Sequence, residues 1–122
     1  MYQLFVEEHF DAAHYIRNYR GKCENLHGHR FKVIARLEAT GLNEAGLAYD
    51  FAELKRHLRE LLARFDHACL NDVSPFDQRE PTCENIAANV YDSLRSRLLS
   101  QPVRLASVEV WETPTSGAAY SP

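Results

Sequence analysis

Residues 23–40 read CENLHGHRFKVIARLEAT, and this stretch decides the expected fold. From His29 to Thr40, apolar side chains occupy every second position, as expected for a β-strand with one buried face. The apolar face carries Phe31, Val33, Ala35 and Leu37, and the opposite face carries Lys32, Arg36 and Glu38. The run therefore predicts a strand that packs one face on a hydrophobic core and keeps the other more polar.

Two histidines stand at the start of this strand. His27 and His29 are at positions i and i+2, so their side chains should project from the same face. Together with His14 from a neighbouring segment, they could give one zinc ion three nitrogen ligands and leave the fourth position free, as in catalytic sites. Gly28 lets the backbone come close without a side chain in the way. Cys23 is near enough to be a fourth ligand, a nucleophile or a base, and the spacing leaves these alternatives open.

The remaining elements predict an α+β domain. The expected order is ββααββ, an antiparallel four-stranded sheet with two helices on one face. Besides the strand His29–Thr40, the expected elements are a strand at about Tyr2–His9, helices at about Phe51–Phe65 and Cys83–Leu99, a strand at about Val103–Thr113 and an edge strand at Ala118–Ser121. The second face of the sheet must be either covered or exposed to water. Because little of the chain remains to cover it, we expect the protein to form oligomers.

Length and composition limit the class of protein. The 122 residues, 45% hydrophobic and 25% charged with net charge −3, predict a single soluble domain spanning 1–122. A pI of about 6.0 without a basic stripe argues against nucleic-acid binding. Apolar runs fall short of the roughly 20 residues of a membrane span, and the first residues lack signal-peptide features. We therefore expect a cytoplasmic protein without membrane contact, and its three cysteines as free thiols.

Two further positions could carry chemistry. In Asp66-His67, the carboxylate can orient the ring and stabilise its charged form; the alternative is a histidine favoured by a helix C-terminus. Glu112 follows Val108 and Val110 in an inward row and would need donors, such as the paired N–H groups of a guanine or pterin ring. The alternative is a surface glutamate at a strand end.

Two other segments are less distinctive. Thr82, Glu84 and Asn85 have the pattern of a helix start. Arg17, Arg20 and Lys22 make the segment before Cys23 positive; such a run is usually a solvated loop, but beside a metal site it could hold phosphates.

Taken together, these motifs resemble the 6-pyruvoyl-tetrahydropterin synthase family over nearly the whole chain. The motifs are Phe10-Asp11-Ala12-Ala13-His14, Cys23-x3-His27-Gly28-His29, Asp50-Phe51, Asp66-His67 with Leu70-Asn71, Pro81-Thr82-x-Glu84-Asn85, and Glu112-Thr113 with Tyr120. The resemblance implies the tunnelling fold (T-fold), in which subunits join their sheets into a barrel. It also implies a homohexamer made of two trimers, with active sites between subunits.

The resemblance implies a role for each matching residue. The family's zinc ligands correspond to His14, His27 and His29. Its catalytic residues correspond to Cys23, Asp66 and His67, and its pterin-anchoring glutamate to Glu112. Thr82 and Glu84 belong to a segment that helps to line the same pocket.

Three residues between Cys23 and His27 look like the spacing of the 6-carboxy-tetrahydropterin synthases of queuosine biosynthesis. The implied reaction converts 7,8-dihydroneopterin triphosphate and water to 6-carboxy-5,6,7,8-tetrahydropterin, acetaldehyde and triphosphate, which makes the protein a zinc-dependent lyase. Two alternatives stay open. One is the pyruvoyl-forming synthase on the same scaffold, and the other is a noncatalytic zinc-binding or pterin-binding module.

Overall fold

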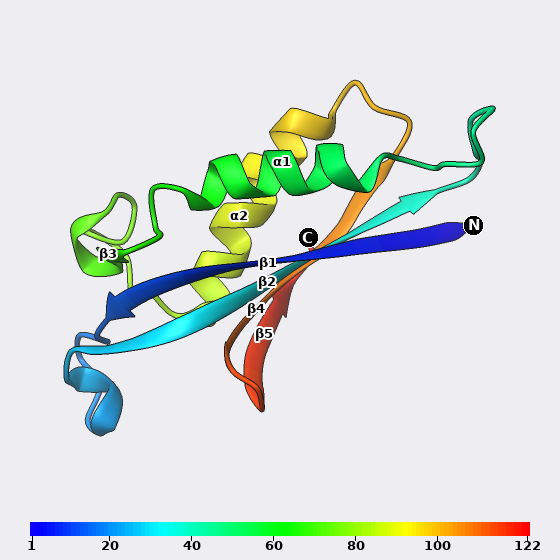
Figure 1. Cartoon of the computed structure of the whole chain (residues 1–122). Coiled ribbons are helices and arrows are strands. Elements are labelled where there is room, and N and C mark those ends of the chain that lie inside the picture. The colour runs from blue at the N-terminus through cyan, green and yellow to red at the C-terminus, as the bar shows by residue number, and fades with distance from the viewer.

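The computed structural model describes residues 1–122 and places two helices across one face of a twisted five-stranded sheet (Figure 1). The strand order is β3-β1-β2-β4-β5. The strands are β1 Tyr2–His14, β2 His27–Ala39, β3 Ala68–Cys69, β4 Arg104–Thr113 and β5 Ser116–Tyr120. The helices are α1 Phe51–Leu62 and α2 Cys83–Leu98, with short 3₁₀ turns η1 Lys22–Glu24 and η2 Leu70–Asp72. None of the helices is long and apolar enough to span a bilayer.

The sheet confirms the α+β class and differs from the prediction by one strand. The four long strands pair antiparallel in the expected arrangement, with both helices on one face. The two-residue strand β3 adds a parallel pairing with β1, which joins Ala12 to Ala68 and Ala13 to Cys69. The expected four-stranded antiparallel sheet is therefore wrong in this detail: the sheet is mixed. A pairing of two residues leaves no alternation in the sequence from which it could be predicted.

Strand β1 continues five residues beyond the predicted end at His9. Its backbone stays paired with β2 as far as His14, which lies opposite His27. Hydrophobic alternation alone does not mark this extension, because the last residues are small or polar. The longer pairing brings two of the predicted metal ligands side by side at one end of the sheet.

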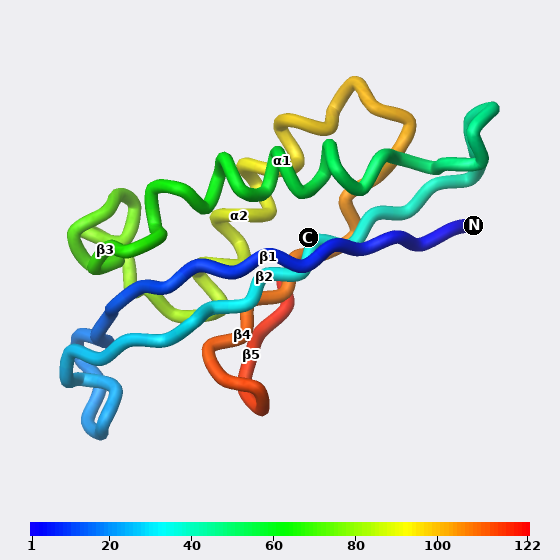
Figure 2. Tube along the Cα trace, viewed as in Figure 1, coloured from blue at the N-terminus to red at the C-terminus, as the bar shows by residue number.

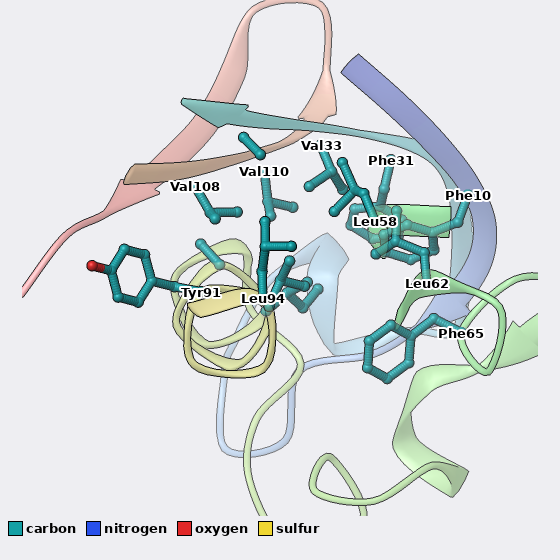
Figure 3. Packing of buried hydrophobic residues seen from close by; sticks show 14 of the residues in the cluster. Phe10, Phe31, Val33, Leu58, Leu62, Phe65, Tyr91, Leu94, Val108 and Val110 are labelled. Atoms are coloured by element: carbon teal, nitrogen blue, oxygen red, sulfur yellow. The ribbon is translucent and has the colours of Figure 1, made fainter. Parts of the chain in front are cut away.

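The core lies between the sheet and the helices (Figure 3). Phe10 of β1 stacks on Phe31 of β2 with ring centroids 4.8 Å apart, and the β2 side chains predicted to face inward are fully buried. Helix α1 contributes Leu54, Leu58 and Leu62 and ends three residues earlier than predicted. Phe65 nevertheless stays buried, because the turn after the helix returns it to the core. Burying side chains of this size stabilises the fold by about 1.5–3 kcal/mol each.

Polar side chains fix where both helices begin. Asp50 accepts a hydrogen bond from the Ala52 N–H at 2.8 Å, and Thr82 accepts one from the Asn85 N–H at 3.2 Å. Each such cap is worth about 1 kcal/mol. Glu53 does not form a capping box with Asp50, since its carboxylate binds Arg56 at 3.0 Å instead.

The sheet face away from the helices is not covered within the chain (Figure 2). Its side chains pair with one another: Arg36 forms an ion pair with Glu109 at 2.7 Å and lies over the Phe5 ring at 5.0 Å. Lys32 lies over the Trp111 ring at 5.1 Å. This face is thus polar with aromatic cover, as the sequence alternation predicted.

Candidate metal centre and active site

Three histidines meet on the core face of the sheet, at the ends of β1 and β2. His14 and His27 are direct partners in the β1–β2 pairing, and His29 follows on the same face of β2. Their ring centroids lie 4.6 to 5.2 Å apart. One ligand atom from each ring lies within 4.8 Å of the other two, so a single ion could reach all three. The strand pairing therefore assembles the predicted ligand set.

The hydrogen bonding of the His14 ring leaves one ring nitrogen free to bind a metal ion. His14 is buried, and its Nδ1 lies 2.8 Å from the carbonyl oxygen of Pro81, so Nδ1–H donates and Nε2 carries the lone pair. That Nε2 is the one buried side-chain polar atom in the chain without a hydrogen-bond partner. A buried polar atom is costly to leave unpaired, and a metal ion would accept its lone pair.

His27 repeats the same pattern. Its Nδ1 lies 2.6 Å from the carbonyl oxygen of Asn25, so its Nε2 is also left with a free lone pair. A second ring nitrogen that donates to a backbone carbonyl is typical of metal-binding histidines, because it fixes the tautomer and the ring orientation. The residues present therefore fit a metal ion.

A cavity of about 290 Å³ opens beside the histidines. Its lining brings together five of the predicted site residues, from four segments of the chain: His14, Cys23, Thr82, Glu84 and Glu112. The volume is near the lower end for small-molecule sites. The cavity places a thiol, carboxylates and a candidate metal ligand, His14, around one space large enough for a small ligand.

Glu112 stands at the end of the inward-facing row of β4, as predicted, and its Oε2 lies 3.8 Å from His29 Nε2. Nearby Cys83 also lines the cavity, although the sequence indicated only a variable position there. Burial raises the pKa of the Cys83 thiol to about 12, with a further contribution from the Glu112 and Glu84 charges. Cys83 therefore stays a neutral thiol, which leaves Cys23 as the candidate for thiolate chemistry.

Asp66 and His67 form the predicted pair, but outside this cavity. His67 Nδ1 lies 3.0 Å from Asp66 Oδ2, and Asp66 Oδ1 accepts the Asp11 N–H at 2.9 Å. These two contacts lower the pKa of Asp66, the Asp11 backbone hydrogen bond most, so the carboxylate stays charged and orients the ring. His67 has φ 59°, a backbone conformation uncommon for residues other than glycine. Its side chain is 78% exposed.

A family model described as 6-pyruvoyl tetrahydropterin synthase matches residues 3–122. The chain belongs to this family. Among its relatives is a 6-carboxy-5,6,7,8-tetrahydropterin synthase from Synechocystis sp., 40% identical over 98% of the chain and 93% of the relative. A protein of the same name from Bacillus subtilis is 33% identical over 99% of the chain and 86% of the relative.

Solved structures agree with this assignment. The 6-pyruvoyl tetrahydropterin synthase of Caenorhabditis elegans superposes with a TM-score of 0.87 at 29% identity, covering 99% of the chain and 95% of the solved one. The family resemblance and the tunnelling fold expected from the sequence are thus confirmed.

The family motifs lie in two places on the chain. One set surrounds the cavity, and Asp66 and His67 lie outside it, beside the outer edge of β1, where His67 lines a separate hollow with Gly28 and His29. Glu112 lies on β4, two strands further across the sheet. The single chain therefore does not bring the Asp66–His67 pair to Cys23.

Several cavity residues were not predicted. Ser116 and Gly117 line it because β4 turns back into β5, and Ile16 and Tyr19 line it from the segment before Cys23. None stands in a motif or at a spacing that indicates chemistry, so the sequence did not single them out. Gly28 is also less constrained than expected, because a Cβ there would meet the Ala12 carbonyl oxygen at an ordinary 3.5 Å.

The charge state of the histidines also favours metal binding. Burial lowers the pKa of His14 below its ordinary 6.5, and the other two rings lower it further against the opposing effect of the Pro81 carbonyl. Burial likewise lowers the pKa of His29, although the Glu112 charge opposes it. Neutral imidazole is the form that binds a metal, so the lowered pKa values keep His14 and His29 in the form that suits a metal ion.

These shifts predict how the stability of the metal-free protein depends on pH. In the unfolded chain His14 and His29 titrate near 6.5, and in the folded chain they titrate lower, so below 6.5 the unfolded state binds more protons. The free energy of unfolding should therefore decrease as pH falls from 7.5 through 6.5 to 5.5. Urea titrations at these values would measure it, and His14→Gln should show a shallower decrease. Constant or rising stability over this range would contradict the prediction.

Proposed function

We propose that the domain spanning 1–122 is a zinc-dependent 6-carboxy-5,6,7,8-tetrahydropterin synthase, a lyase of queuosine biosynthesis. It would convert 7,8-dihydroneopterin triphosphate and water to 6-carboxy-5,6,7,8-tetrahydropterin, acetaldehyde and triphosphate. The observation that carries the proposal is the unpartnered Nε2 of His14, in a cavity that also holds Cys23 and Glu112. The names of the Synechocystis and Bacillus relatives support the carboxy product.

The three histidines are the proposed zinc ligands. Imidazole nitrogens suit zinc, and three protein ligands are typical of its catalytic sites. Zinc bound there would act as a Lewis acid that stabilises the negative charge developing on the substrate during proton removal.

The remaining residues bind the substrate and move protons. Cys23, as a thiolate, takes a proton from a side-chain carbon of the substrate. Glu112 accepts hydrogen bonds from the amino and ring N–H groups of the pterin, with Thr82 and Glu84 as further contacts in the same cavity. His67, oriented by Asp66, returns or removes the second proton. Triphosphate elimination and carbon–carbon cleavage follow.

The distance between the two sets of motifs supports shared active sites. His67 is largely exposed and does not line the cavity, and the one histidine that does, His14, is a proposed zinc ligand. We propose that the Asp66–His67 pair of a neighbouring copy completes the site in a homohexamer made of two trimers. The uncovered, polar sheet face is compatible with such an assembly.

A product assay tests this function against the alternatives. Purified protein incubated with 7,8-dihydroneopterin triphosphate should release acetaldehyde and a 6-carboxypterin. A pyruvoyl product without acetaldehyde would instead assign the activity named for the Caenorhabditis elegans relative. Zinc and pterin binding without turnover would indicate a noncatalytic module.

Glu112→Gln should weaken substrate binding by about 10- to 100-fold, because one of two charged acceptors becomes a donor that faces the pterin N–H groups. Zinc content should stay normal, since the three histidines are unchanged. Fluorescence titration with a nonreactive pterin and metal analysis would measure both. Glu109→Gln is the matched control, because Glu109 is on the same strand but pairs with Arg36 on the other sheet face. Unchanged pterin affinity in Glu112→Gln would remove its proposed role.

A further inference from the structure

The segment that carries Cys23 has few hydrogen bonds of its own. Between residues 15 and 26 the chain forms three backbone hydrogen bonds, of which the long-range one joins the Ile16 N–H to the Cys23 carbonyl at 2.8 Å. The turn η1, which contains Cys23, has no side-chain cap. The position of the Cys23 thiol therefore depends on contacts with other parts of the chain.

Arg17 supplies most of these contacts, all to the segment 71–80. Its backbone N–H donates to Glu80 Oε1 at 2.5 Å, and its Nη1 lies 3.3 Å from Glu80 Oε2. Its guanidinium also donates to the carbonyl oxygen of Phe76 at 3.0 Å and, at 3.4 Å, to those of Asn71 and Arg79. The Arg17 and Glu80 side chains are 29% and 30% exposed, so this pair is partly shielded from water.

These contacts correct one expectation from the sequence. Arg17 was a candidate for holding phosphates, but its guanidinium N–H groups are directed at protein oxygens. In the trace of Figure 2, the segments 15–26 and 70–82 both lie at the end of the sheet away from the N-terminus, where the Arg17 hydrogen bonds join them. Arg17 joins these two segments and is not free for a ligand.

Glu80 connects this contact to the metal-binding histidines. Its backbone carbonyl accepts the side-chain N–H of Asn85 at 2.9 Å, and the next carbonyl, of Pro81, accepts Nδ1–H of His14 at 2.8 Å. On the other side, Ile16 is the neighbour of Arg17 and holds the Cys23 carbonyl. A continuous series of bonds therefore runs from Cys23 through Arg17 and Glu80 to His14.

We propose that Arg17 and Glu80 are a positioning pair that fixes the Cys23 thiol relative to the His14 ring. The inference rests on the proposed function for the role of Cys23, and neither residue touches the substrate. A displacement of about 1 Å in a reacting group can cost up to 100-fold in rate, so this pair should affect catalysis through geometry alone.

The test uses Arg17→Ala, Glu80→Ala and Glu80→Gln in the full chain. Both alanine variants should lower kcat by about 10- to 100-fold with little change in KM or metal content. The kcat of Glu80→Gln should lie between that of the alanine variants and that of the wild-type protein, because the glutamine keeps an acceptor for the Arg17 N–H. It also provides a measurement if Glu80→Ala does not fold.

A second measurement does not depend on turnover. Alkylation by iodoacetamide, followed by mass spectrometry, gives the reaction rate of Cys23 relative to Cys69 in the same molecule. This ratio should change several-fold in the Arg17 and Glu80 variants. Arg64→Ala is the matched control: Arg64 donates to the Ser74 carbonyl at 2.7 Å in the same 71–80 segment but does not contact the Cys23 segment. It should leave kcat and the ratio unchanged.

The outcomes separate the two proposals. The proposal that Arg17 and Glu80 position Cys23 is wrong if their variants keep the alkylation ratio of the wild-type protein. It is also wrong if Arg64→Ala alters that ratio equally. If the unchanged protein forms no 6-carboxypterin, the proposed function is wrong, and the alkylation ratio still decides whether Arg17 and Glu80 position Cys23.

Discussion

His29→Ala is expected to lose most of its bound zinc and to lower turnover by at least about 100-fold. The substitution leaves two imidazoles of the three, and zinc sites of this type need all three protein ligands. Metal analysis of protein purified with zinc in the buffer would measure the loss. His9→Ala is the control, because His9 pairs with Glu7 on the sheet face away from the site and should keep its zinc.

Thermal unfolding gives an independent readout of the same site. A ligand that binds the folded state stabilises it by about 2.7 kcal/mol at 100 times its dissociation constant. Zinc should therefore raise the unfolding temperature of the unchanged protein and of His9→Ala, but hardly that of His29→Ala. Stoichiometric zinc in His29→Ala, or an equal shift in all three proteins, would contradict the assigned ligand set.

Part of the grouping of the three histidines could be predicted because it follows from local rules. His27 and His29 share a face in any strand, whatever its partners. The position of His14 was harder to predict, since the predicted first strand ended at His9. Its place beside His27 follows from the β1–β2 pairing, which continues where the side chains give no alternating pattern.

Other features depend on pairings between distant parts of the chain. Glu112 reaches His29 because β2 and β4 pair in a particular register, with Lys32 opposite Trp111. Strand β3 forms because the chain after α1 passes along the edge of β1. Neither pairing produces a periodic pattern in the sequence. Composition and spacing could therefore suggest the candidate site residues but not the distances between them.

The Arg17–Glu80 contact shows the same limit for charges. A run of positive residues before Cys23 indicated a solvated loop or a phosphate site. The structure pairs one of them with an acid 63 positions away. Whether a charged side chain forms an ion pair here depends on how two distant loops pack against each other. The local pattern of the sequence does not show that packing.

Cys23→Ala is expected to lower turnover by about 10²- to 10⁴-fold, the usual contribution of a positioned proton acceptor. Zinc content and pterin affinity should be retained, because the three histidines and Glu112 are unchanged. Steady-state kinetics, metal analysis and pterin titration would measure the three properties. Cys69→Ala is the control, since Cys69 pairs with Ala13 at the sheet edge and does not line the cavity.

The same variant decides between a base and a permanent fourth ligand. A site closed by three histidines and a thiolate would leave no position for substrate, and the carboxylates around the cavity would have no function. In cobalt-substituted protein with a bound pterin analogue, a direct thiolate bond would give strong near-ultraviolet charge-transfer absorption. We expect that band to be absent. If it persists and Cys23→Ala loses its zinc, Cys23 is a structural ligand and the proposed mechanism fails.

Mixing variants then tests where the second proton acceptor comes from. His67 lies outside the cavity that holds Cys23 of the same chain, so the two should act together only across a subunit boundary. Cys23→Ala and His67→Ala should each be nearly inactive alone. Unfolded together and refolded as mixed oligomers, they should recover part of the activity, because some boundaries then combine an intact Cys23 with an intact His67. Recovery would not occur if both residues acted within one chain, since every chain in the mixture lacks one of them.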